Sequence, residues 1–309
     1  MPLTLEQALT GISGILVTPY DGNGDIAPER LAPIVDRALA AGLHMPVVNG
    51  NTGEFYALTT DEAETMVREV VGMVDGRAPV LAGVGRGVRD AVRVARVARD
   101  AGASALMVHQ PPDAFVAPRG LIDYLRTVAD ASGGLPMMLY LRNDAIGTKA
   151  IAELCALPEV RGVKWATPNP QKLADARAAC DPSIVWVGGL AEVWALVFYA
   201  VGARGFTSGL INVWPERSVA IHAALEAGDF AAANALIDGM RVFEEIRAEE
   251  MGGTNVTGVK AALIAQGLDC GPTRPPSAWP LTEAQQTRLD AFIAANGIGA
   301  AAVRTAGFA

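Results

Sequence analysis

The chain alternates a short apolar run with a helical pattern eight times in succession, and this alternation constrains its fold more than any other feature. Each run is about five residues long and is followed by a polar or glycine-rich turn. The runs are residues 14–18, 45–48, 80–82, 105–108, 137–140, 160–166, 184–187 and 205–208. Eight alternating units of this size predict an α/β fold, a (β/α)8 TIM barrel, rather than a doubly wound sheet.

The helical patterns begin near residues 28, 61, 88, 120, 148, 171, 191 and 216. Several of them run into a glycine just before the next strand, which is the usual C-cap of a helix. Asp61, with Glu64 three residues later, resembles a capping box, so we expect Asp61 to be the N-cap of the second helix.

The eighth unit ends near residue 226, and a helical tail covers about 230–298. The tail is too short for a second catalytic domain, and no linker or low-complexity segment divides the chain. We therefore expect a catalytic barrel over residues 1–228 and, over residues 229–309, a C-terminal helical extension packed on the barrel's side.

Composition excludes several classes of protein. Hydrophobic residues make up 51% of the 309 residues and charged residues 19%, so a large core is expected and global disorder is excluded. The net charge is −8, and no cluster of Lys and Arg is interleaved with aromatic residues. We expect no nucleic-acid partner.

The three cysteines are far apart in sequence and form no CxxC motif, and the three histidines have no metal-ligand spacing. The cysteines therefore fit a reducing compartment and do not form a disulfide framework. We expect no metal site and no cofactor. The first eleven residues lack the pattern of a signal peptide. Residues 184–203 are apolar, but Gly188 and Gly189 divide them into a strand and a helix, so we expect a cytoplasmic protein without a membrane partner.

Lys164 lies near the carboxyl end of the sixth apolar run. On an arbitrary edge strand such a lysine would point to solvent. Because the neighbouring runs are apolar on both faces, as in a buried parallel sheet, this lysine is expected to be paired or used chemically. A partly desolvated lysine loses its proton more easily and attacks ketones to form a Schiff base. Lys164 is the candidate nucleophile.

Two further features should meet Lys164 at the carboxyl ends of the strands, where barrels build their sites. The turn that contains Asn51 and Thr52 offers side chains and backbone N–H groups that can bind a carboxylate, although it can equally be an ordinary polar turn. Tyr140 ends the strand before the lysine strand. Its phenol can relay protons, or it can simply stack at the rim of the barrel.

A glycine-rich segment, residues 83–87, follows the third run. It resembles a phosphate-binding loop only superficially, because GxGxxG fails at Val88. We do not expect a nucleotide site.

A series of motifs over nearly the whole chain resembles the dihydrodipicolinate synthase / N-acetylneuraminate lyase family of class I aldolase-type barrels. The motifs include Gly50-Asn51-Thr52-Gly53-Glu54, Ala82-Gly83-Val84-Gly85, Tyr140, Gly162-Val163-Lys164, Gly188-Gly189, Asn212-Val213…Pro215 and Gly271-Pro272…Arg274-Pro275-Pro276. The resemblance implies a Schiff-base lysine at Lys164, a proton-relaying Tyr140, and a pyruvyl carboxylate held by Gly50, Asn51 and Thr52. It further implies a pocket lined by Ser208 and the Gly189 backbone, a small 2-keto acid as substrate, and a homotetramer.

The chain also departs from this pattern. True dihydrodipicolinate synthases carry a tyrosine pair after the fourth strand, where this chain has His109 and Gln110, and an arginine at the place of Ala145. The segment from Tyr140 to Ala145 instead resembles that of 5-dehydro-4-deoxyglucarate dehydratases with two residues exchanged. At the lysine turn, Trp165 and Ala166 depart from that subgroup as well.

We therefore expect a lyase that dehydrates or cleaves a deoxy-keto sugar acid through an imine on Lys164. Condensation of pyruvate with aspartate semialdehyde is the alternative activity, and a ligand-binding sensor without turnover is the alternative of another class. Arg142 follows Tyr140 by two positions, so both side chains should face the same way. Arg142 would then bind the distal carboxylate or hydroxyls of the substrate, unless Asp113 or Asp144 already pairs with it.

Overall fold

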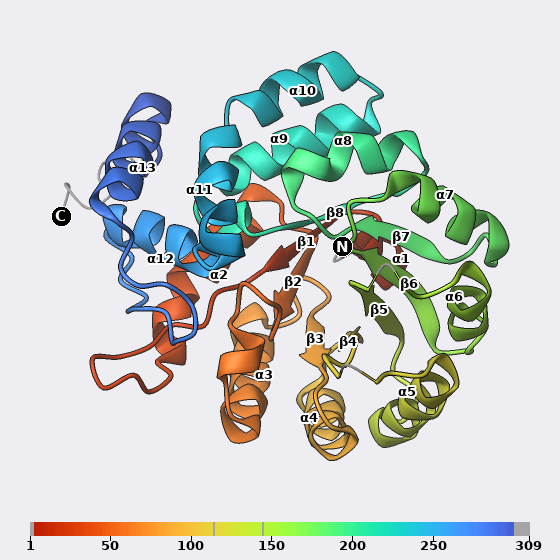
Figure 1. The fold of residues 1–309 in the computed structure, drawn as a ribbon. Helices are drawn as coiled ribbons and strands as arrows, with labels where there is room; N and C mark the ends of the chain where they lie inside the picture. Colours follow the sequence, from red (N-terminus) through yellow and green to blue (C-terminus); the bar gives the residue numbers. More distant parts are fainter. Residues whose placement is uncertain (1–2, 114, 144, 300–309) are drawn as a thin grey trace.

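The computed structural model describes residues 3–113, 115–143 and 145–299, and its centre is a closed barrel of eight parallel strands in sequence order (Figure 1). The strands are β1 (Ile12–Ile15), β2 (Met45–Val48), β3 (Leu81–Val84), β4 (Ala105–His109), β5 (Met137–Leu141), β6 (Val160–Trp165), β7 (Val185–Gly188) and β8 (Phe206–Ser208). The predicted (β/α)8 barrel is confirmed. The first strand begins two residues earlier than predicted, and the predicted run extends beyond its end because Leu16 and Val17 are apolar and buried although they follow the strand.

Helices follow every strand and form the outer ring (Figure 1). The α-helices are α1 (Leu5–Leu9), α2 (Ala32–Ala41), α3 (Thr60–Val74), α4 (Val88–Ala101), α5 (Pro118–Ser132), α6 (Thr148–Cys155), α7 (Pro170–Ala179), α8 (Glu192–Ala200), α9 (Pro215–Glu226), α10 (Phe230–Asp238), α11 (Arg241–Gly252), α12 (Asn255–Ala265) and α13 (Glu283–Asn296). Short 3-10 turns lie at η1 (Pro28–Leu31), η2 (Phe55–Ala57) and η3 (Leu210–Asn212).

The ends of these helices follow local chemistry. Gly42 and Gly102 end α2 and α4 with φ of 105° and 91°, a left-handed conformation that glycine adopts without a Cβ clash. The predicted N-cap of α3 is wrong. Thr59 caps this helix, and Thr59 and Glu62 form the capping box, because the Thr59 hydroxyl accepts from the Glu62 N–H while the Glu62 carboxylate accepts from the Thr59 N–H.

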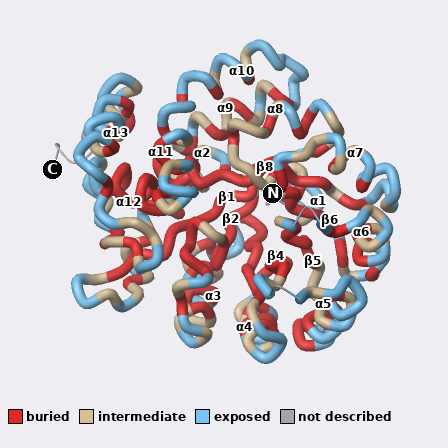
Figure 2. Tube along the Cα trace, viewed as in Figure 1, coloured by how far each residue is buried: buried red, intermediate tan, exposed pale blue. Residues whose placement is uncertain are grey.

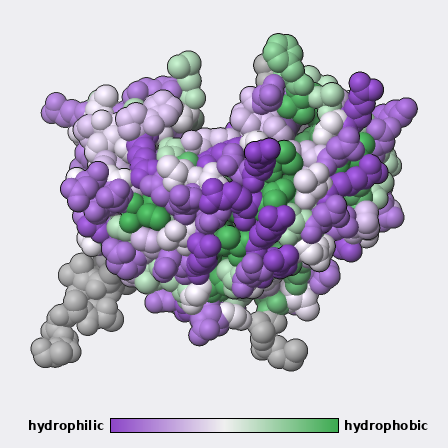
Figure 3. All heavy atoms as spheres, turned by 90° about the horizontal axis from the view of Figure 1, so that it is seen from below, coloured by the Kyte–Doolittle hydropathy of each residue, from purple (hydrophilic) through white to green (hydrophobic). Residues whose placement is uncertain are grey.

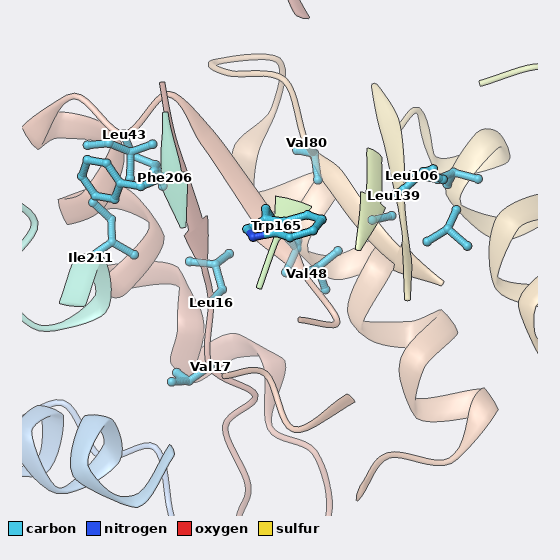
Figure 4. Close-up of a cluster of buried hydrophobic side chains, with 14 of the residues drawn as sticks. Leu16, Val17, Leu43, Val48, Val80, Leu106, Leu139, Trp165, Phe206 and Ile211 are labelled. Carbon is cyan, nitrogen blue, oxygen red and sulfur yellow. The ribbon is translucent and has the colours of Figure 1, made fainter. Parts of the chain in front are cut away.

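The core has two layers. Inside the barrel, side chains such as Met45, Met107 and Met138 form one cluster, which α1 closes at the amino-terminal end with Ala8 and Leu9. The larger layer lies between the strands and the surrounding helices (Figure 4). Figure 2 shows that buried residues follow the strands and the helix faces turned toward them. Nothing in the sequence pattern indicated α1 as the plug of the barrel.

The C-terminal helices pack beside the barrel. Helix α10 contacts α8 and α9, and α11, α12 and α13 contact one another on the side of the barrel where α2 lies (Figure 1). In the part of the chain that the structure describes, no helix is both long and apolar enough to span a membrane. On the face drawn in Figure 3, polar residues predominate and apolar residues form small patches among them, as on a surface in contact with water.

Candidate active site

A cavity of about 340 Å³ lies at the carboxyl ends of the strands. Its walls contain six of the predicted site residues, namely Asn51, Thr52, Tyr140, Arg142, Lys164 and Gly189. The remaining lining residues are Ile15, Ala166, Leu190, Ala191, Thr207, Gly209, Glu244, Arg247, Ala248, Gly252 and Asn255. The structure thus brings together residues from β2, β5, β6, β7 and β8 and from the C-terminal extension.

Lys164 is the buried cation at the centre of this site. It lies beside Tyr140 in the register of β6 and β5, and its Nζ is 3.9 Å from the centre of the Tyr140 ring. Lys164 is only 2% exposed, and no carboxylate of the described residues forms an ion pair with it. Burial, together with the nearby Arg142 guanidinium, lowers the pKa of Lys164 to about 7. A large fraction of Lys164 is therefore the neutral amine at neutral pH, as a nucleophile must be.

Tyr140 is held in place by a hydrogen bond from the turn after β2. The Asn51 Nδ2 donates to the Tyr140 hydroxyl oxygen over 2.9 Å. Burial raises the pKa of Tyr140 to about 12, so the phenol keeps its proton at neutral pH. When a neutral amine attacks a carbonyl carbon, a protonated phenol beside it can donate a proton to the oxygen that departs from this carbon.

The turn after β2 presents unused hydrogen-bond donors. The backbone N–H groups of Asn51 and Thr52 donate to no other group in the described part of the chain. The turn itself is firmly fixed, because the Gly53 N–H donates to the Gly50 carbonyl and the Gly53 carbonyl accepts from the Thr18 hydroxyl over 2.7 Å. Preorganised N–H groups next to a buried cation form a suitable site for a carboxylate.

Arg142 is the second cation that lacks a carboxylate. Its guanidinium lies 5.4 Å from the ring centres of both Tyr56 and Tyr140, and one Nη donates to the Tyr56 hydroxyl over 3.2 Å. Its Nε is buried without a partner. Asp113 does not pair with it, and Asp144 lies outside the described residues. Arg142 is therefore available to a ligand anion as far as the described chain shows.

The structure places two predicted binding residues outside the cavity wall. The Ser208 hydroxyl hydrogen-bonds Glu192 over 2.5 Å and Ser218 over 3.0 Å, so the prediction that Ser208 lines the pocket is wrong. Adjacent residues of a strand face opposite sides, and Thr207 faces the cavity instead. Gly50 supports the turn through its carbonyl oxygen, and a Cβ there would lie 2.4 Å from Ile15.

Gly189 has a clear reason to be glycine. A Cβ at this position would lie 2.7 Å from the carbonyl oxygen of Trp165, to which the Gly189 N–H also donates. Ala191, which lies two residues later and also lines the wall, has φ of 60°, a conformation that is unfavourable for alanine. Such strain beside a cavity is common at functional sites.

His109, which begins the segment that stands in place of the expected tyrosine pair, is fully buried, and its ring centre lies 5.2 Å from that of Tyr140. Its ring stacks on Phe55 at 4.3 Å, and its Nε2 donates to the Asn49 carbonyl over 2.9 Å. Burial lowers the pKa of His109 to about 3, with smaller contributions from Lys164 and Arg142. His109 is thus a neutral packing residue that adds no positive charge to the site.

Sequence reasoning missed the contribution of the C-terminal extension. Glu244, Arg247, Ala248 and Gly252 of α11 and Asn255 of α12 line the cavity. The tail was predicted to pack on the side of the barrel, and no motif indicated which of its side chains reach the mouth. The described residues contain no group of three or more His, Cys, Asp or Glu side chains that could hold a metal ion.

Comparisons with known proteins show the family and the fold of the chain. The model of the family described as "Dihydrodipicolinate synthetase family" matches residues 8–296. A probable 5-dehydro-4-deoxyglucarate dehydratase 1 of Streptomyces coelicolor is 36% identical over 291 residues, which cover 90% of this chain and 92% of that protein. A 4-hydroxy-tetrahydrodipicolinate synthase of Exiguobacterium sp. is 32% identical, with 91% of this chain and 95% of that protein covered.

Among solved structures, dihydrodipicolinate synthase from Oceanobacillus iheyensis superposes with a TM-score of 0.90 at 34% identity, over 94% of this chain and 98% of that chain. The dihydrodipicolinate synthase of Bacillus clausii gives a TM-score of 0.91 at 33% identity, over 95% and 100%. The family match spans both the barrel and most of the C-terminal extension, and the chain belongs to the dihydrodipicolinate synthetase family.

Proposed function

We propose that this chain is a class I lyase that acts on a 2-keto acid through a Schiff base on Lys164, and that its substrate is a deoxy-keto sugar acid. The observation that carries the proposal is the pair of basic side chains in the cavity wall, the buried Lys164 and the half-buried Arg142, neither of which has a carboxylate partner among the described residues. Two basic groups without a counter-charge in one cavity favour an anionic ligand. The free N–H groups of Asn51 and Thr52 give its carboxylate a fixed place.

The reaction follows from these positions. The neutral Lys164 amine attacks the C2 carbonyl carbon, and the resulting hydroxyl leaves as water after it takes a proton, for which Tyr140 is the nearest phenol. The Tyr140 phenolate that this step leaves then takes the C3 proton, and the protonated imine accepts the electron pair of the C3–H bond. In the resulting enamine, the electron pair gained from C3 expels the hydroxyl at C4, which leaves as water when it is protonated. Hydrolysis of the imine then releases the product and frees Lys164.

Dehydration is preferred over condensation with aspartate semialdehyde because of the residues around Tyr140. Ala145 stands where an arginine is expected to bind the carboxylate of that aldehyde, and the segment His109–Asp113 stands in place of the expected tyrosine pair. Relatives of both kinds resemble the chain: the Streptomyces coelicolor protein is named a probable dehydratase and the Exiguobacterium protein a synthase. Retention of Lys164, Tyr140 and the carboxylate turn in one cavity supports an enzyme over a sensor that has lost turnover.

Reduction with borohydride in the presence of pyruvate tests the proposal directly. The chain has only four lysines, Lys149, Lys164, Lys172 and Lys260, so mass spectrometry can assign a reduced adduct unambiguously. We expect one adduct, on Lys164, that is lost in Lys164→Ala and kept in Lys149→Ala, which alters an exposed lysine. Absence of any adduct in the wild type would favour the sensor. Turnover of a panel of sugar-acid-derived 2-keto acids would then identify the substrate, and rapid condensation with aspartate semialdehyde would overturn the preferred subgroup.

The proposal includes a cytoplasmic homotetramer, as the family resemblance implies. Exposed apolar residues on α8, such as Val197, support an interface there, because Val197 is 41% exposed beside the half-buried Trp194. Light scattering at micromolar concentration should give about four times the chain mass of 32.1 kDa. A monomer under these conditions would contradict it.

A further inference from the structure

Three side chains from the C-terminal extension form a second polar group in the cavity wall, separate from Lys164 and Arg142. Glu244 and Arg247 lie on α11, and Asn255 begins α12. An Nη of Arg247 donates to the Glu244 carboxylate, and its Nε and other Nη donate to the Asn255 Oδ1 over 3.1 and 2.6 Å. The side chains of Arg247 and Glu244 are only 7% and 11% exposed. We call these three residues the roof cluster.

The surrounding backbone is shaped to admit the Arg247 side chain. A Cβ on Gly209, directly after β8, would lie 2.3 Å from an Nη of Arg247, and a Cβ on Gly258 would lie 3.2 Å from its Cγ. The end of α11 is also unusual, since Glu250 and Met251 adopt left-handed conformations with φ of 52° and 60°. The local geometry therefore places the guanidinium against the barrel at a conformational cost, as is common where structure serves a site.

The charge of the roof cluster differs from that of Arg142. Arg247 is neutralised by Glu244, so the cluster presents hydrogen-bond donors and acceptors without a net charge. A second carboxylate at this place would meet the Glu244 oxygens, which repel it. A hydroxyl group, which both donates and accepts, matches such a cluster. The Asn255 Nδ2 adds a donor that makes no hydrogen bond in the described part of the chain.

We propose that the roof cluster is the subsite that recognises the hydroxyl groups of the substrate chain, while Arg142 takes a terminal carboxylate. This inference rests on the proposed function and adds to it that Arg142 and the roof cluster, which contains Arg247, bind different groups of the substrate. The cavity would then distinguish a polyhydroxylated 2-keto acid from an unsubstituted one of equal length. The distinction would come from the extension rather than from the barrel.

Three substitutions test the roof cluster in the full chain. Asn255→Asp keeps the acceptor for Arg247 but removes the free Nδ2 donor. Glu244→Gln keeps the shape and uncovers the positive charge of Arg247. Gly209→Ala leaves all three residues unchanged in sequence but displaces the Arg247 guanidinium, because its Cβ would lie 2.3 Å from an Nη. Glu245→Gln, on the next position of α11 and outside this cavity, is the matched control.

The readouts are the KM for a hydroxylated six-carbon 2-keto diacid and the inhibition constant of 2-oxoadipate, which has the same length and no hydroxyls. Gly209→Ala should raise that KM about tenfold, or 1.4 kcal/mol, and change the 2-oxoadipate constant less than about threefold, within ordinary context effects. Asn255→Asp should also raise that KM about tenfold. Because its added negative charge repels a diacid, Asn255→Asp should weaken 2-oxoadipate too, but less than the hydroxylated ligand. Glu244→Gln should weaken the hydroxylated ligand and tighten 2-oxoadipate. Glu245→Gln should change neither constant.

Equal losses for both ligands, or no loss for either, would overturn the roof cluster as a hydroxyl subsite and leave it a structural support. Borohydride trapping of pyruvate on Lys164 separates this outcome from failure of the proposed function. Pyruvate has no chain that could reach a distal subsite, so the adduct should form equally in wild type and all four variants. A wild type that forms no adduct contradicts the Schiff-base function itself.

Discussion

The two fully buried lysines should respond in opposite directions to the same substitution. Lys164 is 2% exposed and has no carboxylate partner among the described residues, whereas Lys260 is 0% exposed and its Nζ lies 2.8 Å from the Glu54 carboxylate. A methionine of similar length fits either space without a charge. We expect Lys164→Met to stabilise the protein and Lys260→Met to destabilise it.

The magnitude for Lys164 follows from its pKa. Folding lowers this pKa from 10.5 to about 7, so the unfolded chain binds more protons between these values and the stability of the wild type rises with pH there. The cost of burying Lys164 is about 4 kcal/mol at pH 7 and falls to about 2 kcal/mol at pH 9, at 1.36 kcal/mol per pKa unit. The advantage of Lys164→Met over the wild type should therefore shrink by about 2 kcal/mol across this interval.

Lys260→Met should lower the unfolding free energy by about 3–5 kcal/mol, because it leaves the Glu54 carboxylate buried and unpaired. Urea unfolding of both variants and the wild type at pH 7 and pH 9, at one protein concentration, measures all four differences. A Lys164→Met variant that is less stable than the wild type, or whose advantage does not depend on pH, would refute the argument that Lys164 is an uncompensated buried amine.

Three further outcomes follow from the site. Tyr140→Phe should lower turnover by about 10²–10⁴-fold while borohydride still traps pyruvate on Lys164, and loss of trapping would instead give the phenol a role in placing the lysine. Arg142→Gln should move the midpoint of the rising pH profile of imine formation to higher pH, because the substitution removes a nearby cation that lowers the pKa of Lys164. It should also weaken the binding of a diacid by about 2–5 kcal/mol and barely affect the binding of pyruvate. An unmoved midpoint with equal losses of affinity for both ligands would contradict this reasoning. Incubation with EDTA should leave activity unchanged, because the proposed chemistry uses only protein groups, and restoration of lost activity by one divalent metal would point to a metal-dependent aldolase.

The barrel and the centre of the site could be predicted from the sequence because both depend on local patterns. Apolar runs of strand length, glycine C-caps and alternating helices specify eight units, and a closed barrel brings the ends of neighbouring strands together. Tyr140 and Lys164 end adjacent strands, so their contact follows from topology alone. The same reasoning located the turn with Asn51 and Thr52.

Two predictions were wrong at positions where a local sequence pattern is compatible with more than one structure. At β8 the ladder covers only Phe206–Ser208, and in so short a strand the pattern does not show which of Thr207 and Ser208 faces the cavity. The capping box of α3 was displaced by two residues, because Thr59 with Glu62 and Asp61 with Glu64 offer the same spacing. Only the hydrogen bonds of the folded chain distinguish these alternatives.

The C-terminal extension escaped prediction for a different reason. Its helices are apolar on several sides, since α12 buries residues from Val256 to Leu263 all around its axis, so hydrophobic periodicity does not reveal which side chains face a ligand. Arg247 looks like a surface residue by sequence, and it is buried by the packing of α11 against α12 and against Gly209 after β8.

The extension is connected to the site at two separate points. Lys260 of α12 pairs with Glu54, and the Arg274 N–H donates to the same carboxylate over 2.8 Å. Glu54 directly follows the turn whose Asn51 and Thr52 N–H groups are expected to hold the substrate carboxylate, so this contact fixes one end of the ligand. The roof cluster, which includes Arg247, is the second connection and forms part of the cavity wall. A barrel without the extension would retain Lys164 and Tyr140, yet it would lose the support of the carboxylate turn and part of the cavity wall. In the proposed function the nucleophile therefore belongs to the barrel, whereas the choice of substrate depends on both parts of the chain.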